Sequence, residues 1–208
     1  GPAIDAPLGQ VPGIAIDVAG NVFASDVGTN LVVKVTSNGI LHVVAGNGIS
    51  GFSGDGGPAT SASLSNSYGV AVDAVGNLYI ADGQNAAVRV INRQTMPLVV
   101  GGVTIAPGNI DTVAGVLGTA GFNGDGGLAD PVQPKTVQLR TPTAVDIYGT
   151  TGAVYLLDSR NNRLRVLNPN PSGGPALSVL GVSIPAAKML TVIPGPLVGS
   201  ILFSPNKV

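Results

Sequence analysis

The residues best suited to chemistry in this chain are two aspartates that lie among glycines. The segment GFSGDGG places Asp55 between glycines, and GFNGDGG places Asp125 in the same setting. Such a loop can bind Ca²⁺ through carboxylate and backbone oxygens, or hold an anion with its amides. Each loop has one carboxylate, and the D-x-D-x-D-G spacing of calcium loops is missing. We therefore interpret both loops as connections in which Asp caps backbone amides, with Ca²⁺ as the alternative.

Further aspartates recur at the ends of short apolar runs. Asp17, Asp73 and Asp146 follow the first run of each repeat, and Asp26, Asp82 and Asp158 follow the second. Paired carboxylates can serve as general acid and base. Because these recur once per repeat, we expect them to cap turns instead. Asn30, Asn85 and Asn161, which follow the second aspartates, belong to the same turn chemistry.

Nucleophilic and basic groups are sparse. The chain has one histidine, His42, and no cysteine. A Ser-His-Asp triad would have to use His42, but no G-x-S-x-G elbow accompanies it. We expect His42 to face solvent or to line a channel. The one basic cluster is Arg160, Arg163 and Arg165, and on a strand Arg163 and Arg165 share a face that we expect to be solvated. The residues thus predict no catalytic site.

The composition excludes several partners. Charged residues make up 10% of the chain and its net charge is −1, which argues against binding to nucleic acid. No apolar segment reaches the ~18 residues that span a bilayer. Few Lys and much Ser, Thr, Asn and Gly favour a secreted protein, placed outside the cell, at a bacterial cell surface or in the periplasm. We expect no cofactor.

Short β-branched runs between Gly, Asn and Pro predict strands. The predicted strands are 13–17, 22–26, 31–36 and 40–46, then 69–73, 78–82, 87–92 and 110–115, then 143–147, 153–158, 163–168 and 189–195. Tight turns between consecutive strands predict antiparallel meanders. Insertions at 93–109 and 169–188 precede the last strand of the second and third repeats, and Gly101-Gly102 predicts an extra hairpin in the first insertion.

The repeat is clearest in GVAVDAVGNLYIADGQNAAVRVIN (69–92), which resembles the NHL repeat of β-propeller proteins. The segments GFSGDGGPATSASL and DTVAG resemble the bacterial secreted branch of that family. The resemblance implies an all-β propeller of four-stranded antiparallel blades. We expect one domain, 1–208, with blades at about 12–46, 62–115 and 137–195, and with 196–208 as the start of a fourth.

Such propellers usually close with six blades, so this chain would form an open arc, or part of a ring that another chain or segment completes. An open arc exposes apolar faces at its two ends. We therefore predict a non-catalytic structural or protein-interaction module that self-associates, by ring completion or filament-like assembly, or docks onto the rest of a longer chain. The predicted interface residues are Leu98, Val99, Val100, Val103, Ile105, Leu177, Val179, Leu180, Val182, Ile184, Ile201, Leu202 and Phe203.

Two other functions stay open. The resemblance also implies metal-dependent lyases and hydrolases of the six-bladed type, whose metal lies in the axial channel. Such lyases hold their metal with several histidines, whereas this chain has only His42. The other alternative is a propeller that binds a glycan or a small ligand.

Overall fold

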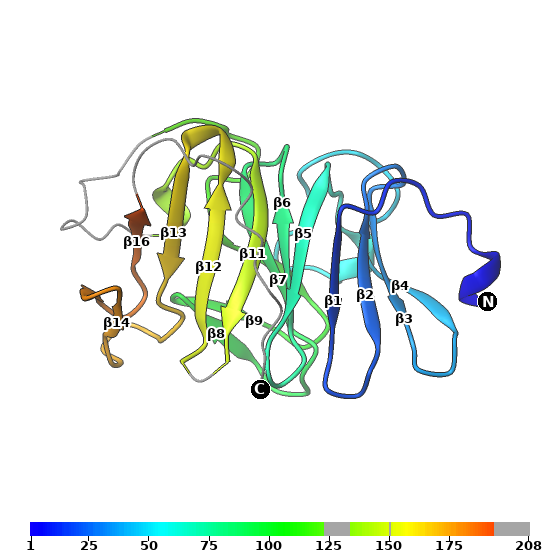
Figure 1. The fold of residues 1–208 in the computed structure, drawn as a ribbon, viewed down its shortest axis with the longest axis horizontal. Helices are drawn as coiled ribbons and strands as arrows, with labels where there is room; N and C mark the ends of the chain where they lie inside the picture. The colour runs from blue at the N-terminus through cyan, green and yellow to red at the C-terminus, as the bar shows by residue number, and fades with distance from the viewer. Residues whose placement is uncertain (123–133, 150, 194–208) are drawn as a thin grey trace.

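The computed structural model of the chain describes residues 1–122, 134–149 and 151–193. In Figure 1, three antiparallel sheets stand next to one another along the long axis of the molecule. Each has four strands, and we call them blades 1, 2 and 3 in chain order. The predicted fold class is therefore confirmed as an all-β, partial β-propeller.

Each blade is a meander whose strands pair in chain order. Blade 1 has β1 (Gly13–Ile16), β2 (Val22–Asp26), β3 (Leu31–Val35) and β4 (Leu41–Ala45). Blade 2 has β5 (Ser67–Val72), β6 (Leu78–Asp82), β7 (Ala87–Ile91) and β10 (Ile110–Ala114). Blade 3 has β11 (Pro142–Tyr148), β12 (Ala153–Asp158), β13 (Arg163–Leu167) and β16 (Met189–Ile193).

The helices of the described residues are single 3-10 turns: η1 (Ala3–Asp5), η2 (Ala59–Ser61), η3 (Pro134–Thr136) and η4 (Ser159–Asn161). In this part of the chain, no helix has the length and apolar character needed to cross a bilayer.

Both insertions form hairpins. The first contains β8 (Leu98–Val100) and β9 (Val103–Ile105), and Gly101 and Gly102 turn between them with positive φ, so the expected hairpin is confirmed. The second contains β14 (Leu177–Val179) and β15 (Val182–Ile184). Its tip is Leu180-Gly181, in the place of the two glycines.

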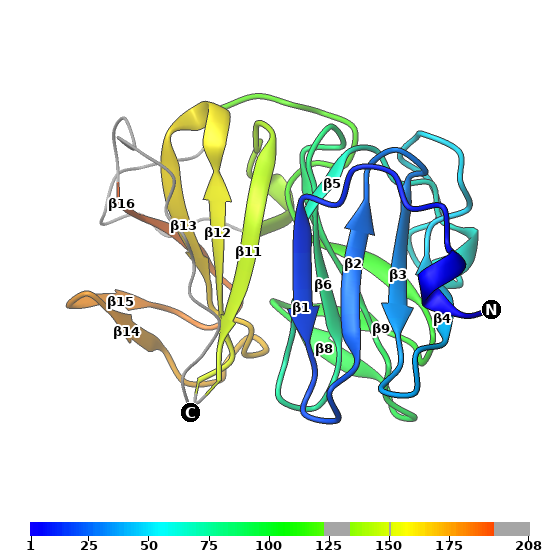
Figure 2. The same cartoon turned by 45° about the vertical axis from the view of Figure 1, so that its right-hand side comes forward.

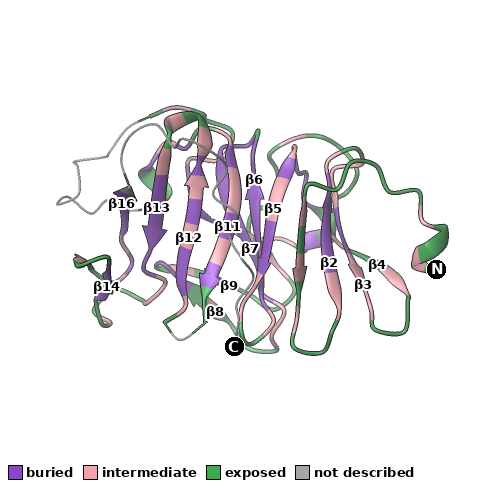
Figure 3. Ribbon diagram, in the orientation of Figure 1, coloured by how far each residue is buried: buried purple, intermediate pink, exposed green. Residues whose placement is uncertain are grey.

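The core lies between the blades. One apolar cluster joins Phe23 and Val32 of blade 1 to Leu78 and Ile80 of blade 2. A second cluster joins blade 2 to blade 3 and includes the β8–β9 hairpin. Blade 2 is accordingly covered on both of its faces, and its strands β6 and β7 are buried along their whole length (Figure 3). Apolar residues on both faces of a sheet are what a stack of blades requires.

The first strands of the blades are neighbours, β1 against β5 and β5 against β11 (Figure 2). Glycines permit this close approach. A Cβ added to Gly13 would lie 2.2 Å from the carbonyl oxygen of Tyr68, and one added to Gly69 would lie 2.8 Å from the Cα of Ala144.

One predicted strand end is wrong. Asp17 and Asp73 directly follow β1 and β5, but Asp146 lies inside β11, opposite Tyr155. The residues opposite the equivalent Phe23 and Tyr79 are Ala15 and Ala71. Pairing with β12 extends β11 to Tyr148, so Asp146 takes the place of an alanine two residues before the turn.

Candidate functional site

A buried arginine fastens the GFSGDGG loop to blade 2. Arg89 lies on β7 and is fully buried. Its guanidinium donates to the Asp55 carboxylate from Nη2 at 2.8 Å and from Nε at 3.1 Å. It also donates to the carbonyl oxygens of Ser53 and Ser63. The loop supplies the Asp55 carboxylate and the Ser53 carbonyl, and the chain that follows it supplies the Ser63 carbonyl, so that together they satisfy a cation taken out of water.

The end of β6 completes this arrangement. The fully buried Asp82 accepts hydrogen bonds from the Ser65 amide at 2.9 Å, from the Ser67 hydroxyl at 3.2 Å and from the Asn85 side chain at 2.8 Å. Its Oδ2 lies 3.6 Å from Nη1 of Arg89. Asn85 also donates to the carbonyl oxygen of Gly51, so Asn85 and Arg89 both tie the incoming loop to the blade.

Blade 3 repeats this geometry. Asp158 accepts from Nε of Arg165 at 2.9 Å, from Asn161 at 2.9 Å and from the Arg140 amide at 2.7 Å. Asn161 donates in addition to the carbonyl oxygen of Gly121. Burial raises the pKa of the Asp158 carboxyl, although these hydrogen bonds and the Arg165 charge oppose it.

The expectation that Arg165 faces solvent is therefore wrong. Its side chain is fully buried: the Leu156 opposite it belongs to the apolar cluster between blades 2 and 3, and the Phe122 ring lies 6.0 Å from its guanidinium carbon. Strand periodicity put Arg163 and Arg165 on one face but could not say that the face is packed.

Blade 1 lacks the arginine. Val33 stands where blades 2 and 3 have Arg89 and Arg165. Asp26 nevertheless caps backbone, accepting from the amides of Gly9 and Gly28 at 3.0 Å each. In blades 2 and 3, a GDGG loop in the sequence is followed by an arginine on the third strand. This shared occurrence is a sequence signal by which Arg89 could have been found.

The geometry at Asp55 does not favour Ca²⁺. Its Oδ1 is already bonded to a guanidinium, whose positive charge opposes a second cation at the same oxygen. In the described ranges, no three His, Cys, Asp or Glu side chains group as a metal site would require. The other candidate, Asp125, lies outside the described residues.

Asp17 and Asp73 hold the first turn of their blades. The Asp17 carboxylate accepts from the amides of Ala19 and Asn21 and from the Asn21 side chain at 2.8 Å and 3.0 Å. Partial burial raises its pKa, but the Asn21 and Ala19 hydrogen bonds outweigh this and hold the pKa of Asp17 below 3.8. Asp73 makes the same bonds with Val75 and Asn77. These two predictions of turn capping are confirmed.

The remaining predicted residues are spread over the arc. His42 is exposed on β4, opposite Lys34. In the first hairpin, Val100 and Ile105 are buried between blades 2 and 3, Leu98 and Val103 pack beside them, and Val99 is exposed. In the second, Leu177, Val179 and Ile184 pack on blade 3 with Val182 beside them, and Leu180 is exposed. Ile201, Leu202 and Phe203 lie outside the described residues.

The outer face of blade 1 is open along its first strand, β1, although Ala24 and Val33 on the same face are buried. Ile14 and Ile16 alternate with Ala15, which packs toward blade 2, so they point away from it. Each is 64% exposed. By strand register, the counterparts of Ile14 are Val70 and Val145, which are 6% and 5% exposed because a neighbouring blade covers them. We call the blade 1 face that carries Ile14 and Ile16 the head.

On the far face of blade 3, as on the outer face of blade 1, a residue whose counterparts are buried is left partly uncovered. Phe23, Tyr79 and Tyr155 occupy the same position on the second strands. Phe23 is buried against blade 2 and Tyr79 against blade 3, whereas Tyr155 is only half-buried. We call the blade 3 face that carries Tyr155 and the Leu180 hairpin tip the tail.

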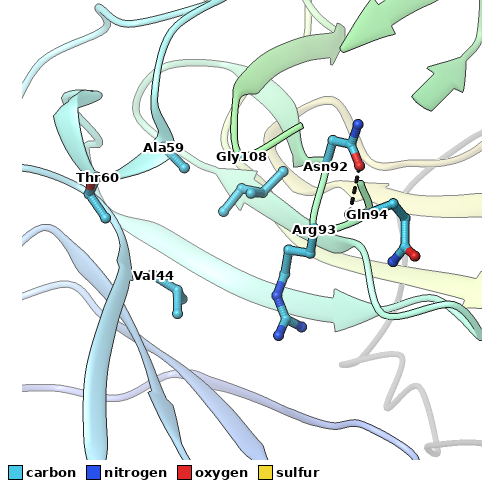
Figure 4. Close-up of a pocket in the computed structure, with 8 residues that line it drawn as sticks. Val44, Ala59, Thr60, Asn92, Arg93, Gln94 and Gly108 are labelled. Atoms are coloured by element: carbon cyan, nitrogen blue, oxygen red, sulfur yellow. Dashed lines mark hydrogen bonds between the residues drawn. The ribbon is translucent and has the colours of Figure 1, made fainter. Parts of the chain in front are cut away.

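A hollow of about 240 Å³ lies where blades 1 and 2 meet. Figure 4 shows Arg93 and Gln94 on one side and Val44, Ala59 and Thr60 on the other. A second hollow of about 180 Å³ shares Arg93 and is lined by Asp17 and Asp73. Sequence patterns gave no reason to single out Arg93.

Comparison with known proteins shows the fold alone. The sequence matches no family profile and no curated protein. A structural-genomics protein of unknown function from Bacteroides thetaiotaomicron VPI-5482 superposes with a TM-score of 0.53 at 16% identity, over 71% of this chain and 44% of that one. An auxiliary nutrient binding protein from Bacteroides ovatus ATCC 8483 gives 0.52 at 12% identity, over 88% of this chain and 36% of that one. The chain thus spans less than half the length of these propeller-like proteins.

Proposed function

We propose that this chain is a non-catalytic protein-interaction module of NHL-type blades, which acts outside the cytoplasm and binds a second copy of itself head to tail. The observation that carries the proposal is the 64% exposure of Ile14, where Val70 and Val145 are covered by a neighbouring blade. Isoleucines on an open strand face, in a fold that stacks sheet on sheet, favour a further sheet as their partner. A composition poor in Lys and rich in Ser, Thr, Asn and Gly supports an extracytoplasmic setting.

The two ends of the arc carry the two kinds of blade face that pack against each other inside the chain. Inside the chain, the face that carries Phe23 or Tyr79 always meets the face of the next blade that carries Val70 or Val145. The tail presents the first kind of face through Tyr155, and the head presents the second kind through Ile14. Repeating the same blade-to-blade step therefore brings the tail of one copy onto the head of another. Contacts of this heterologous kind close into a ring or continue as a filament.

The hairpin tips support this pairing through side-chain size. Gly101 sits so close to blade 3 that an added Cβ would lie 3.0 Å from Cδ1 of Leu167. In the tail, the counterpart of Gly101 is Leu180, which is 74% exposed and has a φ of 50°, a backbone conformation that is costly for leucine. In the head, the counterpart of Leu167 is the smaller Val35. Within the chain, the small Gly101 at a hairpin tip lies against the large Leu167. In the proposed contact between copies, the large Leu180 at the tip lies against the smaller Val35.

Sedimentation velocity over 1–100 µM protein, a range of about a hundredfold, tests the proposal by mass action. We expect the wild-type chain to sediment as dimers or larger species. Ile14→Glu in the head and Leu180→Asp in the tail should each reduce association, because each places a charge in an apolar contact. Met96→Asp is the matched control, since Met96 is also exposed but belongs to neither end.

A mixture of the two variants distinguishes the geometry. Ile14→Glu retains a working tail and Leu180→Asp a working head, so a mixture should form 1:1 dimers and nothing larger. Two variants that stay monomeric when mixed would argue against a head-to-tail contact. A wild-type chain that stays monomeric throughout would overturn self-association and leave another protein, or the rest of a longer chain, as the partner of these ends.

A further inference from the structure

Arg93 is a charged residue that does not recur in the other blades. The preceding Asn92 recurs as Asn168, and both donate to the two ends of their own insertion hairpin. The residues that correspond to Arg93 are Ser37 in blade 1 and Pro169 in blade 3. A residue that recurs in every repeat serves the fold, whereas one that occurs in a single repeat is free to serve a local role.

The guanidinium of Arg93 is positioned but incompletely bonded. It lies 4.6 Å from the centre of the Phe23 ring, and its Nη1 donates to the Gly76 carbonyl oxygen at 2.8 Å. No acceptor for Nε or Nη2 is found in the described ranges, and no carboxylate there comes within 4.0 Å of the group. A half-buried cation that lies over an aromatic ring, with hydrogen-bond donors still available, can bind an anion from outside.

We propose that the 240 Å³ hollow beside Arg93 binds a small monocarboxylate with a short apolar body. The free edge of a guanidinium matches the two oxygens of a carboxylate. The apolar part of the wall is formed by Val44, Ala59 and Ile91, and the exposed Thr60 provides a hydroxyl at the rim. Pockets for drug-sized ligands occupy roughly 300–1,000 Å³, so this one suits a fragment of a few carbon atoms.

The charged residues around the hollow favour a ligand that carries one negative charge. Among the residues that the structure describes, Arg93 is the one charged residue that lines the larger hollow. The smaller hollow on its other side carries the carboxylates of Asp17 and Asp73, which interact with Arg93 through space. These two groups repel a dianion more than a monoanion, so phosphate and sulfate are disfavoured relative to a carboxylate.

Two-dimensional NMR with isobutyrate as the probe tests the proposal. We expect saturable shifts of the Arg93 Nε–H signal and of the Val44 and Ile91 methyl signals, with a millimolar dissociation constant, as suits a ligand of so few atoms. The neutral isostere isobutyramide and inorganic phosphate should bind at least tenfold more weakly.

Two variants separate binding from folding. Arg93→Met should abolish the shifts, whereas Arg160→Met, which changes an exposed arginine elsewhere, should leave them unchanged. Because Arg93→Met also removes the contact with Phe23, Val44→Phe provides a second test, filling the hollow while leaving the Arg93 bonds in place. The proposal is overturned if isobutyramide or phosphate binds as well as isobutyrate, if either variant keeps wild-type affinity, or if the wild-type protein shows no saturable shift.

Discussion

The carboxylate of Asp55 and the guanidinium of Arg89, 34 residues apart in sequence, meet at 2.8 Å. Asp55 belongs to the loop that enters blade 2, and Arg89 belongs to the third strand of that blade. The bond therefore fastens the segment that connects blades 1 and 2 to the third strand of blade 2. It gives the GFSGDGG motif a structural task, because the motif delivers both a carboxylate and turning backbone to a buried cation.

Arg89→Met should lower the free energy of unfolding by about 3–5 kcal/mol, because it leaves the fully buried Asp82 without its cation. Urea denaturation followed by circular dichroism measures this loss. Arg160→Met, at an exposed position, should change stability by less than about 0.5 kcal/mol. Equal effects from the two substitutions would show that the buried ion pair does not support the fold.

The pKa values of Asp17 and Asp146 should shift in opposite directions, although the sequence predicted the same turn-capping role for both. Hydrogen bonds hold the pKa of Asp17 below 3.8, whereas burial raises the pKa of Asp146 above it, against the opposing hydrogen bond from the Ile147 amide. The stability that Asp17 contributes is present above pH 3.8 and is lost as the pH falls through its folded pKa. For Asp146 it is present below pH 3.8 and is lost as the pH rises through its folded pKa.

Carboxyl-carbon NMR titrations of the folded protein check this pair directly. Asp17→Asn should remove part of the acid sensitivity of unfolding, and Asp146→Asn should remove part of the loss at higher pH. A lower pKa for Asp146 than for Asp17 would contradict the placement of Asp146 inside β11.

Gly13→Ala should lower stability by about 1–3 kcal/mol, since its Cβ would lie 2.2 Å from the Tyr68 carbonyl oxygen and force β1 away from β5. Thermal unfolding measures the effect. Gly57→Ala is the control, because its Cβ would meet only the Gly54 carbonyl oxygen at an ordinary 3.4 Å. A Gly13→Ala protein as stable as the control would mean that the two strands can separate freely.

Asn92→Ala should lower the free energy of unfolding by about 1–3 kcal/mol, because the buried carbonyl oxygen of Ile105 and the partly buried one of Met96 lose their donor. Asn168→Ala should have a comparable effect in blade 3, where Asn168 makes the same bonds to its own hairpin. Chemical denaturation of both variants measures this, with the exposed Ser178→Ala as a control. If both asparagine variants match that control, the hairpins do not depend on these amides.

Local patterns alone determined the strands and the turns of this protein. Alternating β-branched residues between Gly, Asn and Pro placed the blade strands and the Gly101-Gly102 hairpin, since these choices depend on nearest neighbours along the chain. Recurrence of Asp17 as Asp73 likewise identified turn caps. The repeat itself determined the architecture, because a four-stranded blade with two apolar faces has to stack on others.

Only the tertiary structure decided which faces are covered and what meets across them. Strand periodicity assigns residues to faces, but the burial of Arg165 depends on the packing of its face, where the opposite Leu156 joins the apolar cluster between blades 2 and 3. Asp146 lies inside β11 and not at its end, because pairing with β12, and not the residue type of Asp146, determines where β11 ends. The hollow at Arg93 lies where blades 1 and 2 meet. The space between two sheets depends on how the sheets pack, so residue propensities along the chain do not predict it.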